Sequence, residues 1–138
     1  MIIKYKVNHP ISVAKFSNLL INSTLSKRRP INDNECLKGM VENSNLIVSA
    51  WHNDQLVGIS RCVIDFHYAC YLSDLAVHLE YQKLGIGREL QVITQNELGP
   101  KCKLILIAAP AANGYYPKLG YSHNDRCWVL NPNEKLCN

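Results

Sequence analysis

The chain has 138 residues, of which 47% are hydrophobic and 19% charged, and its formal net charge is +4. This length and composition are typical of one soluble domain with a sizeable core, so we expect a single domain over residues 1–138. The positive charge is too small and too scattered to indicate nucleic-acid binding, but it is compatible with an anionic cofactor. No apolar run is long enough to span a bilayer, and the N-terminus lacks the layout of a signal peptide. We therefore expect a cytoplasmic protein.

The sequence contains six cysteines, none of them in a C-x-x-C pair. Cys62 and Cys70 fall in apolar segments, where we expect buried thiols in a reducing compartment. No group of cysteines and histidines has the spacing of zinc ligands, so we predict no metal site.

The first 45 residues predict one strand followed by two helices. Residues 2–7 alternate apolar and basic side chains, which indicates a strand. Apolar residues recur along residues 10–25, where we expect a helix with Ser12 as its N-cap. A second, shorter helix is expected over residues 33–41, with Asp33 at its N-cap.

Three successive strands are expected over residues 46–51, 56–66 and 69–77. They are rich in apolar and β-branched residues and are separated by short polar turns, which is typical of an antiparallel meander.

The rest of the chain predicts helices and strands in alternation. A helix over residues 89–98 ends at Gly99, and the apolar run 103–109 that follows predicts a buried strand parallel to strand 69–77. Residues 113–118 predict a short helix, and residues 127–130 predict a last strand. The fold class expected from this order is mixed α+β, with six or seven strands and three or four helices.

The segment between strand 69–77 and the following helix predicts an anion-binding site. Gly85 and Gly87 lie where the helix opens, and Lys83 and Arg88 add positive charge. Helix N-termini present unpaired N–H groups, and glycines let an anion approach them closely, so a phosphate or pyrophosphate is the expected ligand. A Walker loop is excluded because Gly-Lys-Ser/Thr is absent, and a dinucleotide fingerprint because Leu90 replaces its third glycine. The alternative is a glycine turn before an ordinary helix.

Two motifs carry a resemblance to a known family. The pattern Gln/Arg-x-x-Gly-x-Gly/Ala, formed here by Gln82, Gly85 and Gly87, resembles the acyl-coenzyme A loop of the GNAT superfamily of N-acetyltransferases. The segment Tyr115-Tyr116-Pro117-Lys118-Leu119-Gly120-Tyr121 resembles that superfamily's second signature, Phe-Tyr-x-x-Leu-Gly-Phe. The resemblance covers about residues 46–121 and implies a mostly antiparallel sheet splayed in a V between two central parallel strands.

In such a fold, acetyl-CoA is the cosubstrate and lies in the V. The resemblance implies that the backbone of residues 75–77 pairs with the pantetheine arm, while N–H groups of residues 83–88 hold the pyrophosphate. The implied cofactor-binding residues are Leu75, Ala76, Val77, Gln82, Lys83, Leu84, Gly85, Ile86, Gly87, Arg88 and Asn113.

The implied reaction is direct transfer of an acetyl group to an amine. Tyr116 matches the family's tyrosine and is the expected acid for the departing thiolate, whereas Tyr115 is expected to pack in the core. Asp74 has two equal interpretations. In the first it serves the reaction, by binding the cationic amine or by taking its proton through water; in the second it makes a structural hydrogen bond at a β-bulge. Ser73 is expected to line a water chain beside it, and His78 is expected to be exposed.

The acceptor is not specified by these motifs. We expect a primary amine of a small molecule; the alternatives are a protein or aminoacyl-tRNA amine, or an acyl-CoA-binding module without catalysis. Arg28 and Arg29, in the loop between the first two helices, are candidates to meet an anionic group of the substrate. A homodimer is expected only by analogy with the family.

Overall fold

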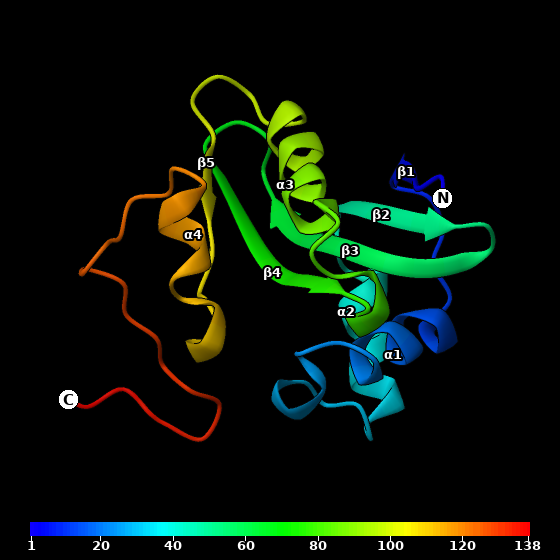
Figure 1. Ribbon diagram of the computed structural model, residues 1–138. Coiled ribbons are helices and arrows are strands. Elements are labelled where there is room, and N and C mark those ends of the chain that lie inside the picture. The colour runs from blue at the N-terminus through cyan, green and yellow to red at the C-terminus, as the bar shows by residue number, and fades with distance from the viewer. The chain divides into compact units, whose positions relative to one another are not determined.

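The computed structural model describes all 138 residues, which form two compact units, Met1–Ile107 and Ala108–Asn138 (Figure 1). The first unit contains β1 (Lys4–Val7), α1 (Val13–Ile21), η1 (Ser26–Arg28), α2 (Asn34–Glu42), β2 (Leu46–His52), β3 (Gln55–Ile64), β4 (Ala69–Val77), η2 (Leu79–Tyr81), α3 (Ile86–Asn96) and β5 (Lys103–Ile105). The second unit contains η3 (Pro110–Ala112) and α4 (Tyr115–Lys118). The expectation of a single domain stays a prediction.

The sheet has five strands in the order β1-β2-β3-β4-β5. The first four pair antiparallel, and β5 pairs with β4 in parallel. The predicted meander and the predicted parallel strand are therefore confirmed, as is the mixed α+β class.

Both predicted helix caps are present. The Ser12 hydroxyl accepts a hydrogen bond of 3.1 Å from the Lys15 N–H, and an Asp33 carboxylate oxygen accepts one of 3.1 Å from the Cys36 N–H. Such caps stabilise a helix by about 1 kcal/mol, because they satisfy N–H groups that have no partner within the helix.

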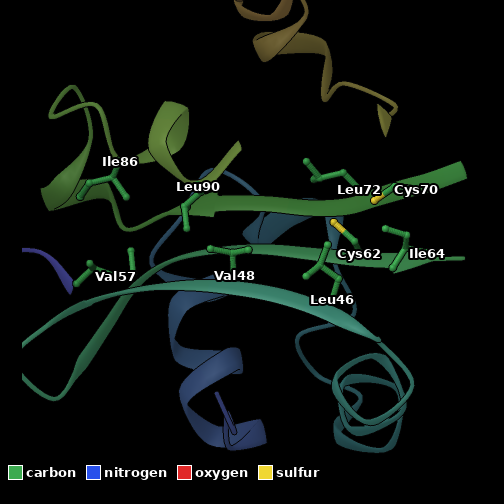
Figure 2. Close-up of a cluster of buried hydrophobic side chains, with 10 residues drawn as sticks. Leu46, Val48, Val57, Cys62, Ile64, Cys70, Leu72, Ile86 and Leu90 are labelled. Atoms are coloured by element: carbon green, nitrogen blue, oxygen red, sulfur yellow. The ribbon is translucent and has the colours of Figure 1, made fainter. Parts of the chain in front are cut away.

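The two faces of the sheet are covered by different helices. Helix α3 packs on one face, where Ile86 and Leu90 lie over Val57 and Val48 (Figure 2). Helices α1 and α2 lie on the opposite side of the strands (Figure 1), and Phe16, Leu19, Leu20 and Leu37 are their fully buried side chains. Burial of apolar surface on both faces holds β4 rigidly between two layers.

Several expectations need correction. The sheet has five strands rather than six or seven, because residues 127–130 form no strand and β5 ends at Ile105 instead of residue 109. A strand exists only where a neighbour completes its ladder, and residues 127–130 have none; Trp128 is 90% exposed. Helix α3 begins at Ile86 rather than residue 89, since Gly85 serves as its N-cap. The expected exposure of His78 and the expected core role of Tyr115 are taken up with the site below.

Candidate active site

Strand β4 pairs with β5 over its first three residues only. The parallel pairing ends at the pair Tyr71 and Ile105. Across β4 and β3, Leu72 pairs with Cys62 and Asp74 with Arg61, which leaves Ser73 as an extra residue in β4. An extra residue of this kind is a β-bulge, which bends a strand and re-aims the residues after it. From Leu72 to Val77, no strand pairs with β4 on the side of β5.

The end of β4 presents backbone polar groups along this free edge. The His78 N–H donates to the Val57 carbonyl oxygen on β3, at 2.8 Å. Because adjacent residues direct their backbone groups to opposite edges of a strand, Val77 and Leu75 present theirs to the edge away from β3. The Gln82 amide confirms this direction, since its Nε2 donates to the Val77 oxygen at 3.2 Å. An extended ligand can add to such an edge as a further strand.

The anion-binding segment, residues 82–88, follows β4 after η2. Lys83 and Gly85 adopt left-handed backbone conformations, with φ of 63° and 82°. The first bond of α3 runs from the Glu89 N–H to the Gly85 oxygen, at 3.0 Å. The N–H groups of residues 83–88 donate to no protein acceptor in the structure. These open donors at a helix N-terminus form a site for an anion such as a pyrophosphate.

The start of α3 is fixed by close packing on Gly58 of β3. A Cβ atom on Gly58 would lie 3.0 Å from Leu90 Cδ1 and 3.1 Å from Ile86 Cγ2. The absence of a side chain at this one position lets the first turn of α3 approach the sheet. Because the open N–H groups belong to this turn and the residues before it, the packing also sets their direction relative to the end of β4.

Asp74 is completely buried and paired with two arginines. Arg29 Nε lies 2.5 Å from one carboxylate oxygen, and Arg61 Nε binds the other. Arg29 comes from the segment between α1 and α2, and Arg61 from β3. Both carboxylate oxygens are thus engaged by guanidinium groups, which is the arrangement expected of the structural alternative for Asp74.

Ser73 lies against the same arginines. Its carbonyl oxygen accepts from Arg29 Nη2 and its hydroxyl accepts from Arg61 Nη2, both at 2.9 Å. Sequence reasoning placed Asp74 and Ser73 together, but it did not predict Arg61 as their partner. The sequence does contain a signal for this pair, because Arg61 is a charged residue within an otherwise apolar strand. Buried charges in proteins are almost always paired, so such a residue predicts a partner of opposite charge.

Tyr116 lies on α4, in the second unit. Its ring packs edge-on against Tyr115 and Tyr121, at centroid distances of 5.2 and 5.4 Å. Burial, and to a smaller extent the neighbouring Tyr115, raises the pKa of the Tyr116 phenol above its usual value, so the group is a neutral donor at pH 7. Tyr115 is 36% exposed, which corrects its expected role as a core residue. Asn113 is also exposed and follows η3.

His78 is buried, with 8% of its surface exposed, so its expected exposure is wrong. Its Nδ1 accepts a hydrogen bond of 3.1 Å from the Glu80 N–H and thereby caps η2. A histidine cap is not predictable from sequence patterns, because Ser, Thr, Asp and Asn are the residues typical of an N-cap.

No three or more His, Cys, Asp or Glu side chains gather where they could hold a metal ion. The helices are all too short or too polar to cross a membrane.

The family profile described as the acetyltransferase (GNAT) domain matches residues 22–127. The chain therefore belongs to the GNAT family of acetyltransferases.

Its relatives carry the same description. The chain is 31% identical over 124 residues to "uncharacterized N-acetyltransferase ycf52-like" of Prochlorococcus marinus, a match that covers 86% of this chain and 63% of the relative. It is 30% identical over 91 residues to "uncharacterized N-acetyltransferase ycf52" of Pyropia yezoensis, which covers 62% of this chain and 52% of the relative. The chain thus spans less than two thirds of the length of either relative.

Solved structures show the same fold. A GNAT acetyltransferase of Streptococcus pneumoniae superposes with a TM-score of 0.73 at 21% identity, over 93% of this chain and 98% of that one. The PaiA N-acetyltransferase of Thermoplasma acidophilum, solved in complex with coenzyme A, superposes with a TM-score of 0.68 at 18% identity. The match covers 91% of this chain and 92% of that one. A ribosomal-protein-alanine N-acetyltransferase from Brucella melitensis superposes with a TM-score of 0.72 at 15% identity, over 94% of this chain and 99% of that one.

Proposed function

We propose that this protein transfers the acetyl group of acetyl-CoA directly to a primary amine of a small molecule. The proposal rests on the unpaired backbone N–H and C=O groups that run from the end of β4 to the start of α3. The free edge at Leu75 and Val77 suits an extended amide-containing arm, and the open N–H groups of residues 83–88 suit a pyrophosphate. Coenzyme A joins these two chemistries in one molecule, and the PaiA neighbour is solved with it.

The cofactor site would draw on several kinds of contact. Leu75 and Val77 would pair with the pantetheine arm through their backbone groups, whereas those of Ala76, which was also expected to pair with the arm, face β3. The pyrophosphate would lie on the N–H groups of the anion-binding segment, with the charges of Lys83 and Arg88 beside it. Gln82 keeps the segment joined to β4 through its bond to the Val77 oxygen. Asn113 is proposed as a further hydrogen-bonding partner of the arm, by resemblance to the family.

Bound acetyl-CoA supplies an activated thioester carbonyl. The Val77 N–H at the free edge is proposed to donate to the carbonyl oxygen as negative charge develops on it. Tyr116 is proposed to give its phenolic proton to the departing thiolate sulfur as the new C–N bond forms and the C–S bond breaks. The amine proton passes to water, and Ser73 is proposed to line that route.

A protein amine is the second candidate acceptor, because one neighbour of the same fold is named a ribosomal-protein-alanine N-acetyltransferase. The modest net charge of +4 gives less support to an aminoacyl-tRNA acceptor.

The test measures release of coenzyme A thiol from acetyl-CoA in the presence of defined amines. The probes are 1,4-diaminobutane, glucosamine and a peptide with an N-terminal alanine, with product mass as the second readout. Acetylation of a small amine supports the proposal, and acetylation of the peptide alone supports the protein acceptor. Tight binding of acetyl-CoA by calorimetry with no acetylated product from any amine would identify a non-catalytic acyl-CoA-binding module.

A further inference from the structure

The bulge at Ser73 is held from two directions by charged side chains. Arg29 donates from Nη2 to the Ser73 carbonyl oxygen, and Arg61 donates from Nη2 to the Ser73 hydroxyl, each at 2.9 Å. The same two arginines bind the two carboxylate oxygens of Asp74. We call this set of four residues (Arg29, Arg61, Ser73 and Asp74) the arginine clamp.

The arginine clamp joins three parts of the first unit. Arg29 lies just after η1, in the segment between α1 and α2, and its Nη1 also donates to the Arg28 oxygen at 2.9 Å. Arg61 reaches the end of α2, where its Nη1 donates to the Ser44 hydroxyl at 2.9 Å and to the Met40 oxygen at 3.3 Å. Ser73 and Asp74 are the point on β4 where both arginines meet. The α1–α2 segment and the bulge are therefore joined by direct hydrogen bonds.

This arrangement costs free energy that an apolar core would not. The Asp74 side chain is fully buried, and the Arg29 and Arg61 side chains are only 21% and 7% exposed. Buried ion pairs contribute little net stability, because desolvation offsets most of their attraction. The hydrogen bonds from the two arginines do fix the orientation of Ser73, the one residue of the bulge that has no partner on β3. They hold both its carbonyl oxygen and its hydroxyl group. Ser73 lies two positions before Leu75, which is the first residue after the bulge whose backbone groups face the free edge of β4.

We propose that Arg29 is a positioning residue for acyl transfer, which acts through Asp74 and Ser73 to fix the direction of the free edge at Leu75 and Val77. Asp74 is then the centre of the arginine clamp and not the base that takes the amine proton. This inference rests on the proposed function, since the free edge is where the thioester carbonyl is proposed to lie. A misplacement of about 1 Å at such a site costs roughly a hundredfold in rate.

The test compares Arg29→Gln with Lys27→Gln, which removes one positive charge from an exposed side chain of the same segment. The first readout is amide hydrogen exchange, which needs no substrate. Exchange at Asp74 and Ala76, whose N–H groups face β3, should rise about tenfold or more in Arg29→Gln and stay unchanged in Lys27→Gln. The second readout is acetyl-CoA turnover with the best amine of the panel: kcat should fall by about tenfold to a hundredfold, a larger factor than the change in calorimetric Kd for coenzyme A, because the open N–H groups of residues 83–88 stay in place.

A double variant separates action through Asp74 from a simple loss of charge. Residues that act as one unit are not additive, so Arg29→Gln/Asp74→Asn should lose no more kcat than Asp74→Asn alone. Native exchange at Asp74 and Ala76 in Arg29→Gln, or full additivity of the two substitutions in kcat, would overturn the proposal. If the native protein acetylates no amine, the proposed function fails, while the exchange measurement still decides whether Arg29 holds the bulge.

Discussion

His52 Nδ1 and the Tyr81 hydroxyl oxygen lie 2.6 Å apart, and this contact ties the end of β2 to the last residue of η2. The Tyr81 ring also packs edge-on against the rings of His52 and His78, each at 5.5 Å. The anion-binding segment begins at the next residue, Gln82. The connection from β4 to that segment is therefore anchored to the β2–β3 hairpin through one side chain.

Tyr81→Phe should destabilise the protein modestly, because it keeps the packed ring and removes the partner of a half-buried histidine. A hydrogen bond of this kind contributes about 1 kcal/mol, which corresponds to a fall in Tm of about 3–5 °C for a chain of this size. Tyr68→Phe is the matched control, since the Tyr68 side chain is 62% exposed and its ring still lies under Lys103 Nζ. Equal melting temperatures for the two variants would show that the His52 contact contributes nothing.

Gly58→Ala should destabilise the protein and weaken coenzyme A binding together. The added Cβ would lie 3.0, 3.1 and 3.3 Å from atoms of Leu90, Ile86 and Ala50, so side chains on both α3 and β2 would have to give way by a few tenths of an ångström. Overpacking of this kind costs about 1–3 kcal/mol. Thermal unfolding and calorimetric Kd are the measurements.

Gly39→Ala is the control for Gly58→Ala, because Gly39 lies inside α2 and a Cβ there meets only Asn43 Nδ2, at 4.0 Å. Alanine should stabilise that helix by about 0.5–1 kcal/mol. A Gly58→Ala protein as stable as the native one would refute the close packing of α3 on β3.

Gly85→Val should weaken acetyl-CoA binding while the domain stays folded. Gly85 has φ of 82°, which costs a β-branched residue about 1–2 kcal/mol, and a side chain there would also stand beside the open N–H groups. Gly85→Asn separates the two effects, because asparagine tolerates the left-handed conformation. Both variants should lose affinity by calorimetry, and only valine should lower Tm strongly. Native affinity in a folded Gly85→Val protein would contradict the phosphate site.

The elements that the sequence predicted correctly depend on local chemistry. Ser12 and Asp33 predict the starts of helices because their side chains satisfy nearby N–H groups, and Gly85 marks the opening of α3 because it adopts the left-handed conformation there. These features need no knowledge of distant residues.

The features that the sequence did not predict depend on pairing between distant segments. The bulge at Ser73 exists only in the register of β4 against β3, and Arg29 meets Asp74 across 45 positions of the chain. The apolar run 127–130 predicted a strand, but a strand also requires a neighbour, which composition does not supply. Residues such as Arg29 and Arg61, which contact the site from distant parts of the chain, are therefore recognised only in the folded structure.

Tyr116→Phe keeps the ring and its packing against Tyr115 and Tyr121 but removes the only proton that this side chain can donate. If Tyr116 protonates the thiolate, kcat should fall by about a hundredfold to ten-thousandfold, with Kd for acetyl-CoA and Tm little changed. Because burial raises the pKa of Tyr116, the phenol stays protonated beyond its usual range, and the native protein should show no loss of kcat from this group up to about pH 10.

Tyr115→Phe is the control for Tyr116→Phe, since it removes the same atom from the adjacent, more exposed ring of α4. Steady-state kinetics on both variants with one confirmed amine, at pH values from 6 to about 10, gives kcat and KM separately. The proposed role requires that kcat falls in Tyr116→Phe alone, because only one of two adjacent helical residues can face the sulfur. A larger loss in Tyr115→Phe would assign the acid to the other tyrosine, and full activity in both would show that water protonates the thiolate.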